Sequence, residues 1–149
     1  MVHLGGGRRF VVVNVSPSVT PGLYVRTDRL PGVGDLVSFE MPAAARPYMF
    51  ARTGHDGEDW FLLKPMVAGP GDVVDTTRGE VRVNGVPVAL MPQTADRVPS
   101  VPLWKASKVL GDDEFFVLST RVVNSFDSRC FGPIRVGDIE AVRRALVTW

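Results

Sequence analysis

Glycine and proline residues are spread along the whole chain and divide it into short segments. The 149 residues include 15 glycines and 12 prolines, and both residue types interrupt regular secondary structure. The segments between them are rich in Val, Phe and Leu, which favours β-strands. The sequence therefore predicts a mainly β fold with several short strands and little helix.

Nine segments have the composition and the flanking turn residues expected of strands. They are residues 9–15, 23–27, 36–40, 60–64, 72–76, 80–83, 86–90, 114–119 and 134–136. Asn84-Gly85 lies between two of these segments, and such a pair accepts positive φ at both positions, which predicts a two-residue type I′ hairpin. Pro87 has no N–H to donate to a neighbouring strand, so we expect residues 86–90 to form an edge.

Helix signals are weak in this sequence. Residues 42–46 predict one or two helical turns that Pro47 then stops. The C-terminal segment 139–149 is compatible with either a helix or a strand, and Val142 and Val147 favour the strand.

The composition excludes several functional classes. Lys and Arg number 17 against 16 Asp and Glu, which gives a net charge of +1, so we expect no nucleic-acid partner bound through phosphate contacts. The single cysteine, Cys130, excludes an internal disulfide. One cysteine with the two histidines, His3 and His55, cannot build the usual structural zinc site. We therefore predict no metal and no cofactor.

The length is that of one ordinary domain. We expect residues 1–8 to form a flexible leader, because they contain three consecutive glycines, and residues 9–149 to form a single domain. No apolar run approaches the roughly 20 residues that a membrane span needs, so the chain as given is expected to be soluble.

Two serines, Ser16 and Ser18, stand in a proline-rich stretch between the first two predicted strands. Pro17 and Pro21 stiffen this backbone, so Ser18 would be held on a rigid turn and could serve as a nucleophile. The alternative is an ordinary turn rich in Ser and Pro that joins two strands.

Lys64 ends an apolar strand and is followed by more apolar residues and a Gly-Pro-Gly turn. Apolar surroundings penalise a charged amine and lower its pKa. A fall in the pKa of the amine from about 10.4 to roughly 7–8 corresponds to about 4 kcal/mol, and desolvation of the charged form can supply this free energy. Lys64 would then be a usable base; the alternative is a surface lysine whose stem packs on the strand end.

The loop from 119 to 133 contains more polar residues than a simple turn requires. An ion pair between Asp127 and Arg129 would fix this loop, so that the Ser125 hydroxyl points at a neighbour. The alternative is a polar loop with a surface ion pair of little energetic value.

Taken in order, these three stretches resemble the motifs of the type I signal peptidase family, serine peptidases with a Ser/Lys dyad, and especially its TraF-type maturation peptidases of conjugative transfer systems. The matching residues are Asn14, Ser16, Ser18, Pro21, Gly22, Leu23 and Tyr24 in the first motif, Lys64 with Gly71-Asp72 in the second, and Asn124, Ser125, Asp127, Ser128, Arg129, Phe131 and Gly132 in the third.

The chain departs from the family pattern at three places. Ser119-Thr120-Arg121 replaces the Gly-Asp-Asn that opens the third motif in general signal peptidases, and this points to the TraF-type branch. Cys130 stands where an aromatic residue is usual, and Pro65 stands where a basic residue is frequent.

The resemblance implies a complex β fold shared by signal peptidases and LexA. It also implies that Ser18 is the nucleophile and Lys64 the base. The Ser18 N–H and the Ser16 hydroxyl would hold the oxyanion, Ser125 would orient the Lys64 amine, and two further residues would have structural roles. Those structural residues are Asp127 and Arg129.

The same resemblance implies a polypeptide partner, an exported pilin-type precursor bearing a signal peptide or a processed end. Some members of the TraF-type branch also close their product into a circle, and the sequence leaves open whether water or an amine ends the reaction. The expected location is the periplasmic face of the bacterial inner membrane, through an anchor absent from this chain.

Two other functions remain open. A LexA-type self-cleaving domain shares the dyad and the β architecture, but no Ala-Gly bond precedes Ser18 in this chain. A non-catalytic β module of a secretion apparatus could retain the three motifs as scaffolding.

Overall fold

The computed structural model describes residues 9–54, 61–93 and 102–149. The predictions for the leader, for His3 and for His55 concern residues outside these ranges. The strands are β1 (Val11–Asn14), β2 (Gly22–Thr27), β3 (Leu36–Glu40), β4 (Phe61–Ala68), β5 (Val73–Asp75), β6 (Glu80–Val83), β7 (Val86–Leu90), β8 (Ser107–Val109), β9 (Glu114–Val117), β10 (Ile134–Arg135) and β11 (Ile139–Thr148).

Helices contribute little to the described part of the chain. They are the short helices η1 (Ala43–Ala45) and η2 (Val136–Asp138) and the α-helices α1 (Arg46–Thr53) and α2 (Ser128–Phe131). The prediction of a mainly β fold with little helix is therefore confirmed.

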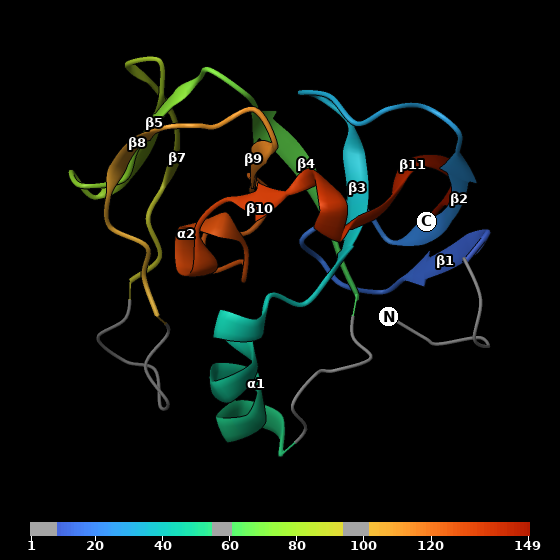
Figure 1. Cartoon of the computed structure of the whole chain (residues 1–149). Coiled ribbons are helices and arrows are strands. Elements are labelled where there is room, and N and C mark those ends of the chain that lie inside the picture. Colours follow the sequence, from blue (N-terminus) through green and yellow to red (C-terminus); the bar gives the residue numbers. More distant parts are fainter. Residues whose placement is uncertain (1–8, 55–60, 94–101) are drawn as a thin grey trace.

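The strands form two antiparallel sheets, which Figure 1 shows on either side of α2. The larger sheet has seven strands in the order β1-β2-β11-β3-β4-β9-β10, and the smaller has four in the order β7-β6-β5-β8. Strand β4 lies inside the larger sheet between β3 and β9. The last strand, β11, pairs with β2 and β3 and so joins the N-terminal strands to the rest of the sheet.

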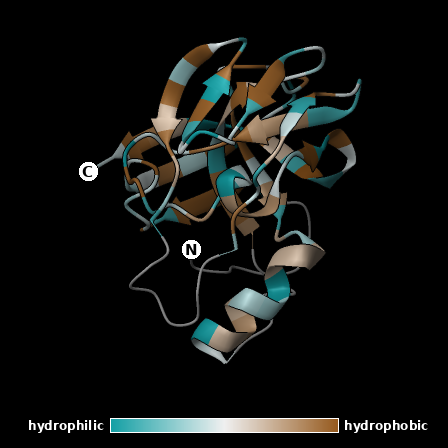
Figure 2. Ribbon diagram, turned by 90° about the vertical axis from the view of Figure 1, so that its left-hand side faces the viewer, coloured by the Kyte–Doolittle hydropathy of each residue, from teal (hydrophilic) through white to brown (hydrophobic). Residues whose placement is uncertain are grey.

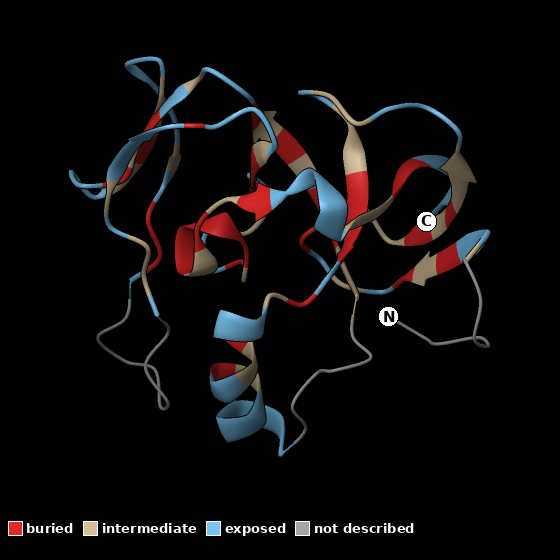
Figure 3. Cartoon of the chain, viewed as in Figure 1, coloured by how far each residue is buried: buried red, intermediate tan, exposed pale blue. Residues whose placement is uncertain are grey.

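Strand β9 separates two apolar clusters. Its residues alternate, with Phe115 and Val117 in one cluster and Phe116 in the other, as expected for a strand buried on both faces. The first cluster packs β9 against β3, β4 and β11, and the second packs it against the smaller sheet. Figure 2 shows hydrophobic segments gathered in the strands of the two sheets, and Figure 3 shows buried segments in β3, β4 and β9 of the larger sheet.

The predicted hairpin is confirmed. Asn84 and Gly85 have φ values of 51° and 80° and connect β6 to β7. Strand β7, which contains Pro87, lies at the edge of the smaller sheet as predicted.

The helical turn predicted at residues 42–46 is present as η1, but the prediction that Pro47 stops the helix is wrong. Pro47 does not stop a helix but stands in the first turn of α1, where no intrahelical partner is available for its missing N–H. The helix ends at Gly54, whose φ of 74° is the left-handed conformation common at helix C-termini. Figure 1 shows α1 projecting away from the two sheets.

Two larger differences from the sequence prediction concern β4 and β8, and the structure also decides one assignment that the sequence left open. Strand β4 does not end at Lys64 but continues through Pro65 to Ala68. Strand β8 was not predicted, and residues 139–148 form a strand, which decides the ambiguous C-terminal segment.

Candidate active site

The loop that carries Ser18 connects β1 to β2 and is held by one buried amide, that of Asn14. Its Nδ2 donates to the carbonyl oxygens of Ser16 at 3.0 Å, Val19 at 2.9 Å and Thr20 at 3.3 Å. Its Oδ1 accepts from the Ser16 N–H at 3.2 Å. Because a single side chain satisfies four backbone groups, the loop has a defined shape, and Ser18 lies within it at 7% exposure.

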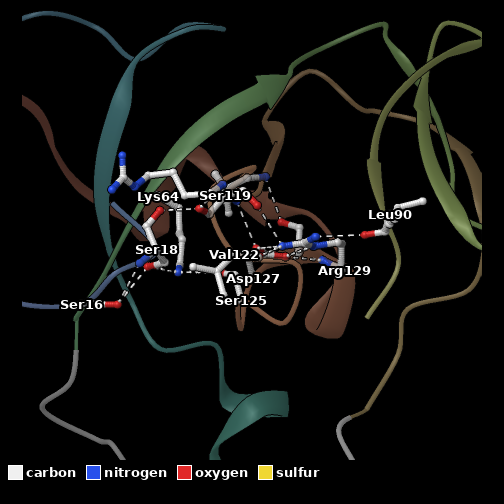
Figure 4. A network of polar contacts seen from close by, with 12 residues as sticks. Ser16, Ser18, Lys64, Leu90, Ser119, Val122, Ser125, Asp127 and Arg129 are labelled. Atoms are coloured by element: carbon white, nitrogen blue, oxygen red, sulfur yellow. Dashed lines mark hydrogen bonds and ion pairs between the residues drawn. The ribbon is translucent and has the colours of Figure 1, made fainter. Parts of the chain in front are cut away.

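Lys64 reaches this loop from the centre of the larger sheet. Its side chain is buried, and its Nζ lies 2.7 Å from the Oγ of Ser18 and 2.7 Å from the Oγ of Ser125. Both distances are those of hydrogen bonds. Figure 4 shows the amine between the two hydroxyls. Residues from three distant parts of the sequence thus meet at one nitrogen atom.

Burial sets the protonation behaviour of Lys64. Desolvation lowers the pKa of its amine from the ordinary 10.5 to about 8, because the charged form loses its hydration. The Asp127 carboxylate opposes this effect, and the Arg129 guanidinium adds to it. A substantial fraction of the amine is therefore neutral near pH 8 and able to accept a proton.

Asp127 and Arg129 form a buried ion pair, so the alternative of a surface pair is wrong. Arg129 Nη2 and Nε donate to the two carboxylate oxygens at 2.8 and 2.9 Å, and both side chains are at most 1% exposed. The guanidinium also donates to the carbonyl oxygens of Leu90, Ser119 and Val122. The pair thereby ties the end of β7 and the loop after β9 to α2, whose first turn Asp127 caps.

Ser16 lies next to the candidate nucleophile. Its Oγ is 3.0 Å from the Oγ of Ser18 and accepts from the Ser18 N–H at 3.4 Å. The Ser18 N–H is therefore directed at the Ser16 hydroxyl, and both groups lie beside the Ser18 Oγ. A hydroxyl and a backbone N–H are groups that can stabilise a negatively charged oxygen.

Two residues to which the sequence assigns no role also contact residues 15–21, the nucleophile loop, which carries the candidate nucleophile Ser18. The Ser119 hydroxyl donates to the carbonyl oxygen of Ser18, and Arg121 Nε donates to that of Pro17 at 3.3 Å. The sequence predicts Ser119 as the end of a strand and Arg121 as part of a polar loop. The available signal was the departure from the Gly-Asp-Asn pattern at these positions.

The family comparison agrees with the resemblance found in the sequence. A family model described as signal peptidase, peptidase S26, matches residues 5–149. The chain belongs to this signal peptidase family.

Relatives of this signal peptidase family member include two proteins named plasmid transfer protein TraF from Escherichia coli. One is 32% identical over 159 aligned residues, which cover 100% of this chain and 89% of the relative. The other is 31% identical over 171 residues, which cover 99% and 94%. A crystal structure of a signal peptidase I from Enterococcus faecalis aligns with a TM-score of 0.46 and 17% identity, over 78% of this chain and 98% of that one.

Potential metal ligands are not clustered in the described part of this signal peptidase family member. Within residues 9–54, 61–93 and 102–149, no three His, Cys, Asp or Glu side chains are grouped so that they could hold a metal ion. In the same ranges, no helix is both long enough and apolar enough to cross a membrane.

Proposed function

We propose that this chain is a serine endopeptidase that uses Ser18 as nucleophile and Lys64 as general base. The observation that carries the proposal is the buried Lys64 Nζ, which lies 2.7 Å from the Ser18 Oγ. A serine hydroxyl becomes an effective nucleophile when a base within hydrogen-bond distance can remove its proton. The lowered pKa of Lys64, about 8, makes the neutral amine available for this step.

The reaction proceeds through an acyl-enzyme. Neutral Lys64 takes the proton of Ser18 as the Ser18 Oγ bonds to the peptide carbonyl carbon, and the carbonyl oxygen becomes negatively charged. The Ser18 N–H and the Ser16 hydroxyl hold this oxyanion. When the C–N bond breaks, the Lys64 ammonium returns its proton to the leaving amine.

The acyl-enzyme is then resolved by a second nucleophile. Water, or an amine if the product is closed into a circle, attacks the ester carbon while Lys64 accepts its proton. The ester C–O bond breaks, and Ser18 recovers a proton from Lys64. Ser125 accepts a hydrogen bond from the Lys64 amine throughout and so keeps it directed at Ser18, consistent with the 2.7 Å contact.

The proposed substrate is an exported polypeptide precursor of a conjugative transfer system, of the pilin type, processed at the periplasmic face of the bacterial inner membrane. Membership of the signal peptidase family supports a polypeptide substrate. The two relatives named plasmid transfer protein TraF support the role in conjugative transfer. An extended peptide segment would bind by pairing with strand edges.

A pH–rate profile tests this proposal. The wild type is compared with Ser18→Ala and Lys64→Ala on a fluorogenic peptide library with small residues beside the cleaved bond. We expect kcat/KM to rise about tenfold per pH unit below pH 8 and to level off above it, because the neutral amine is the active form. Both variants should lose turnover.

A labelling experiment separates an inactive preparation from a non-catalytic β module. A serine-reactive peptidic warhead should modify Ser18 of the wild type, as detected by intact mass, and should leave Ser18→Ala unmodified. Full activity in either variant of the dyad, or a folded wild type that is neither active nor labelled, would refute the proposed function.

A further inference from the structure

The segment 119–121 lies against the nucleophile loop and contacts the backbone on both sides of Ser18. The Ser119 hydroxyl donates to the carbonyl of Ser18 itself, and Arg121 Nε donates to the carbonyl of Pro17, the residue before it. We propose that Ser119 and Arg121 are positioning residues that orient these two peptide groups, so that the Ser18 N–H points at the oxyanion. The inference rests on the proposed function.

The role of Arg121 follows from the geometry of one peptide group. The carbonyl of Pro17 and the N–H of Ser18 belong to the same planar unit, in which they point in opposite directions. Arg121 contacts the carbonyl end at 3.3 Å, and the Ser16 Oγ lies 3.4 Å from the nitrogen at the other end. Holding the carbonyl therefore keeps the N–H directed toward the Ser16 hydroxyl, beside which the oxyanion is proposed to form.

The charge of Arg121 adds to its effect on this peptide group. A cation at the carbonyl oxygen polarises the whole amide and strengthens its N–H as a donor. Arg121 is exposed at the surface of the loop, so its side chain is not part of the packed core. Its replacement should therefore change the orientation of one peptide group and leave the packing of the sheets intact.

Ser119 connects the nucleophile loop to the rigid part of the site, as Figure 4 shows. It is 1% exposed, its N–H donates to Asp127 Oδ2 at 3.1 Å, and its carbonyl accepts from Arg129 at 3.0 Å. The preceding N–H, that of Leu118, donates to the carbonyl of Pro65 at 3.1 Å, next to Lys64. The same short segment thus fixes the nucleophile relative to the base.

The experiment compares Arg121→Ala with the wild type in turnover and in affinity for a peptide aldehyde. The aldehyde forms a hemiacetal with the serine, and its oxygen occupies the position of the oxyanion. We expect kcat to fall 10- to 100-fold, less than the 10²- to 10³-fold typical for complete loss of an oxyanion donor. Aldehyde affinity should fall by a similar factor, while KM changes less than threefold and the Tm is retained. Arg78→Ala, an exposed arginine in the turn before β6, is the control.

Ser119 is tested by Ser119→Ala and by Ser119→Thr, which keeps the hydroxyl. Loss of kcat in the first variant and its recovery in the second would support the inference even if Ser119→Ala is also less stable. The inference is overturned if Arg121→Ala retains wild-type kcat and aldehyde affinity, or if its only change is in KM. If the wild type is inactive and is not labelled at Ser18, the proposed function is refuted and the inference falls with it. If the wild type is active and Arg121→Ala has the same kcat and aldehyde affinity, the inference alone is refuted.

Discussion

The buried amine of Lys64 should make the folded protein less stable at neutral pH than at alkaline pH. Its pKa is about 8 in the folded protein against an ordinary value of 10.5. Between these values the unfolded chain binds more protons than the folded one, so the free energy of unfolding rises with pH. The shift of 10.5 − 8 = 2.5 pH units, at 1.36 kcal/mol per unit, corresponds to about 3 kcal/mol. This penalty is complete below pH 8 and absent well above pH 10.5.

This effect is measured by urea unfolding of the wild type and of Lys64→Met between pH 7 and pH 10. Methionine has a side chain of similar length to lysine but no titrating group. The difference in unfolding free energy between the wild type and Lys64→Met should move in favour of the wild type by roughly 2–3 kcal/mol over this range. The contributions of other groups that titrate at alkaline pH are the same in both proteins and cancel in this difference. Lys105→Met, at an exposed position, reports the general effect of losing a lysine and is subtracted. A difference that stays constant from pH 7 to pH 10 would show that Lys64 is not a low-pKa amine.

Two further predictions concern stability. Gly22→Ala should lower the free energy of unfolding by at least about 1–3 kcal/mol, because an added Cβ would lie 2.3 Å from the carbonyl oxygen of Val147. Gly137→Ala is the control: a Cβ added at Gly137 would have no atom within 4 Å, so the unfolding free energy should change by less than about 0.5 kcal/mol. Equal Tm values for these two variants would contradict the close approach of β2 and β11. Asp127→Asn should cost about 3–5 kcal/mol in urea unfolding, since it leaves the Arg129 charge buried without its counter-ion. A loss below about 1 kcal/mol would contradict a structural role for the pair.

Strands could be predicted where turn residues mark both of their ends. The hairpin at Asn84-Gly85 is an example, since its conformation depends on two adjacent residues alone. Strand β8 has no such signal: its three residues are exposed and form a strand because they pair with β5. Pro47 gives an ambiguous signal, because a proline breaks a helix interior but is compatible with the first turn of a helix.

The candidate site could be found from the sequence where a residue belongs to a recognisable motif. Ser18, Lys64 and Ser125 were selected in this way, and the structure brings them together, while their catalytic roles stay predictions. The contacts of Ser119 and Arg121 could not be found locally, because their acceptors lie 101 and 104 residues earlier in the chain. Only the folded sheet places those carbonyls beside them.

The pairing of β2 with β11 affects how the protein is made. Strand β2, directly after the nucleophile loop, has β1 on one side and β11 on the other, and its Gly22 pairs with Thr148. The N–H of Trp149 donates to the carbonyl of Pro21 within the loop at 3.1 Å. A chain still being synthesised lacks this partner until β11 has emerged, and contacts between distant segments form late and slowly in folding. The loop that carries Ser18 therefore gains its full set of backbone contacts only after β11 (Ile139–Thr148), which lies far later in the sequence, has been synthesised.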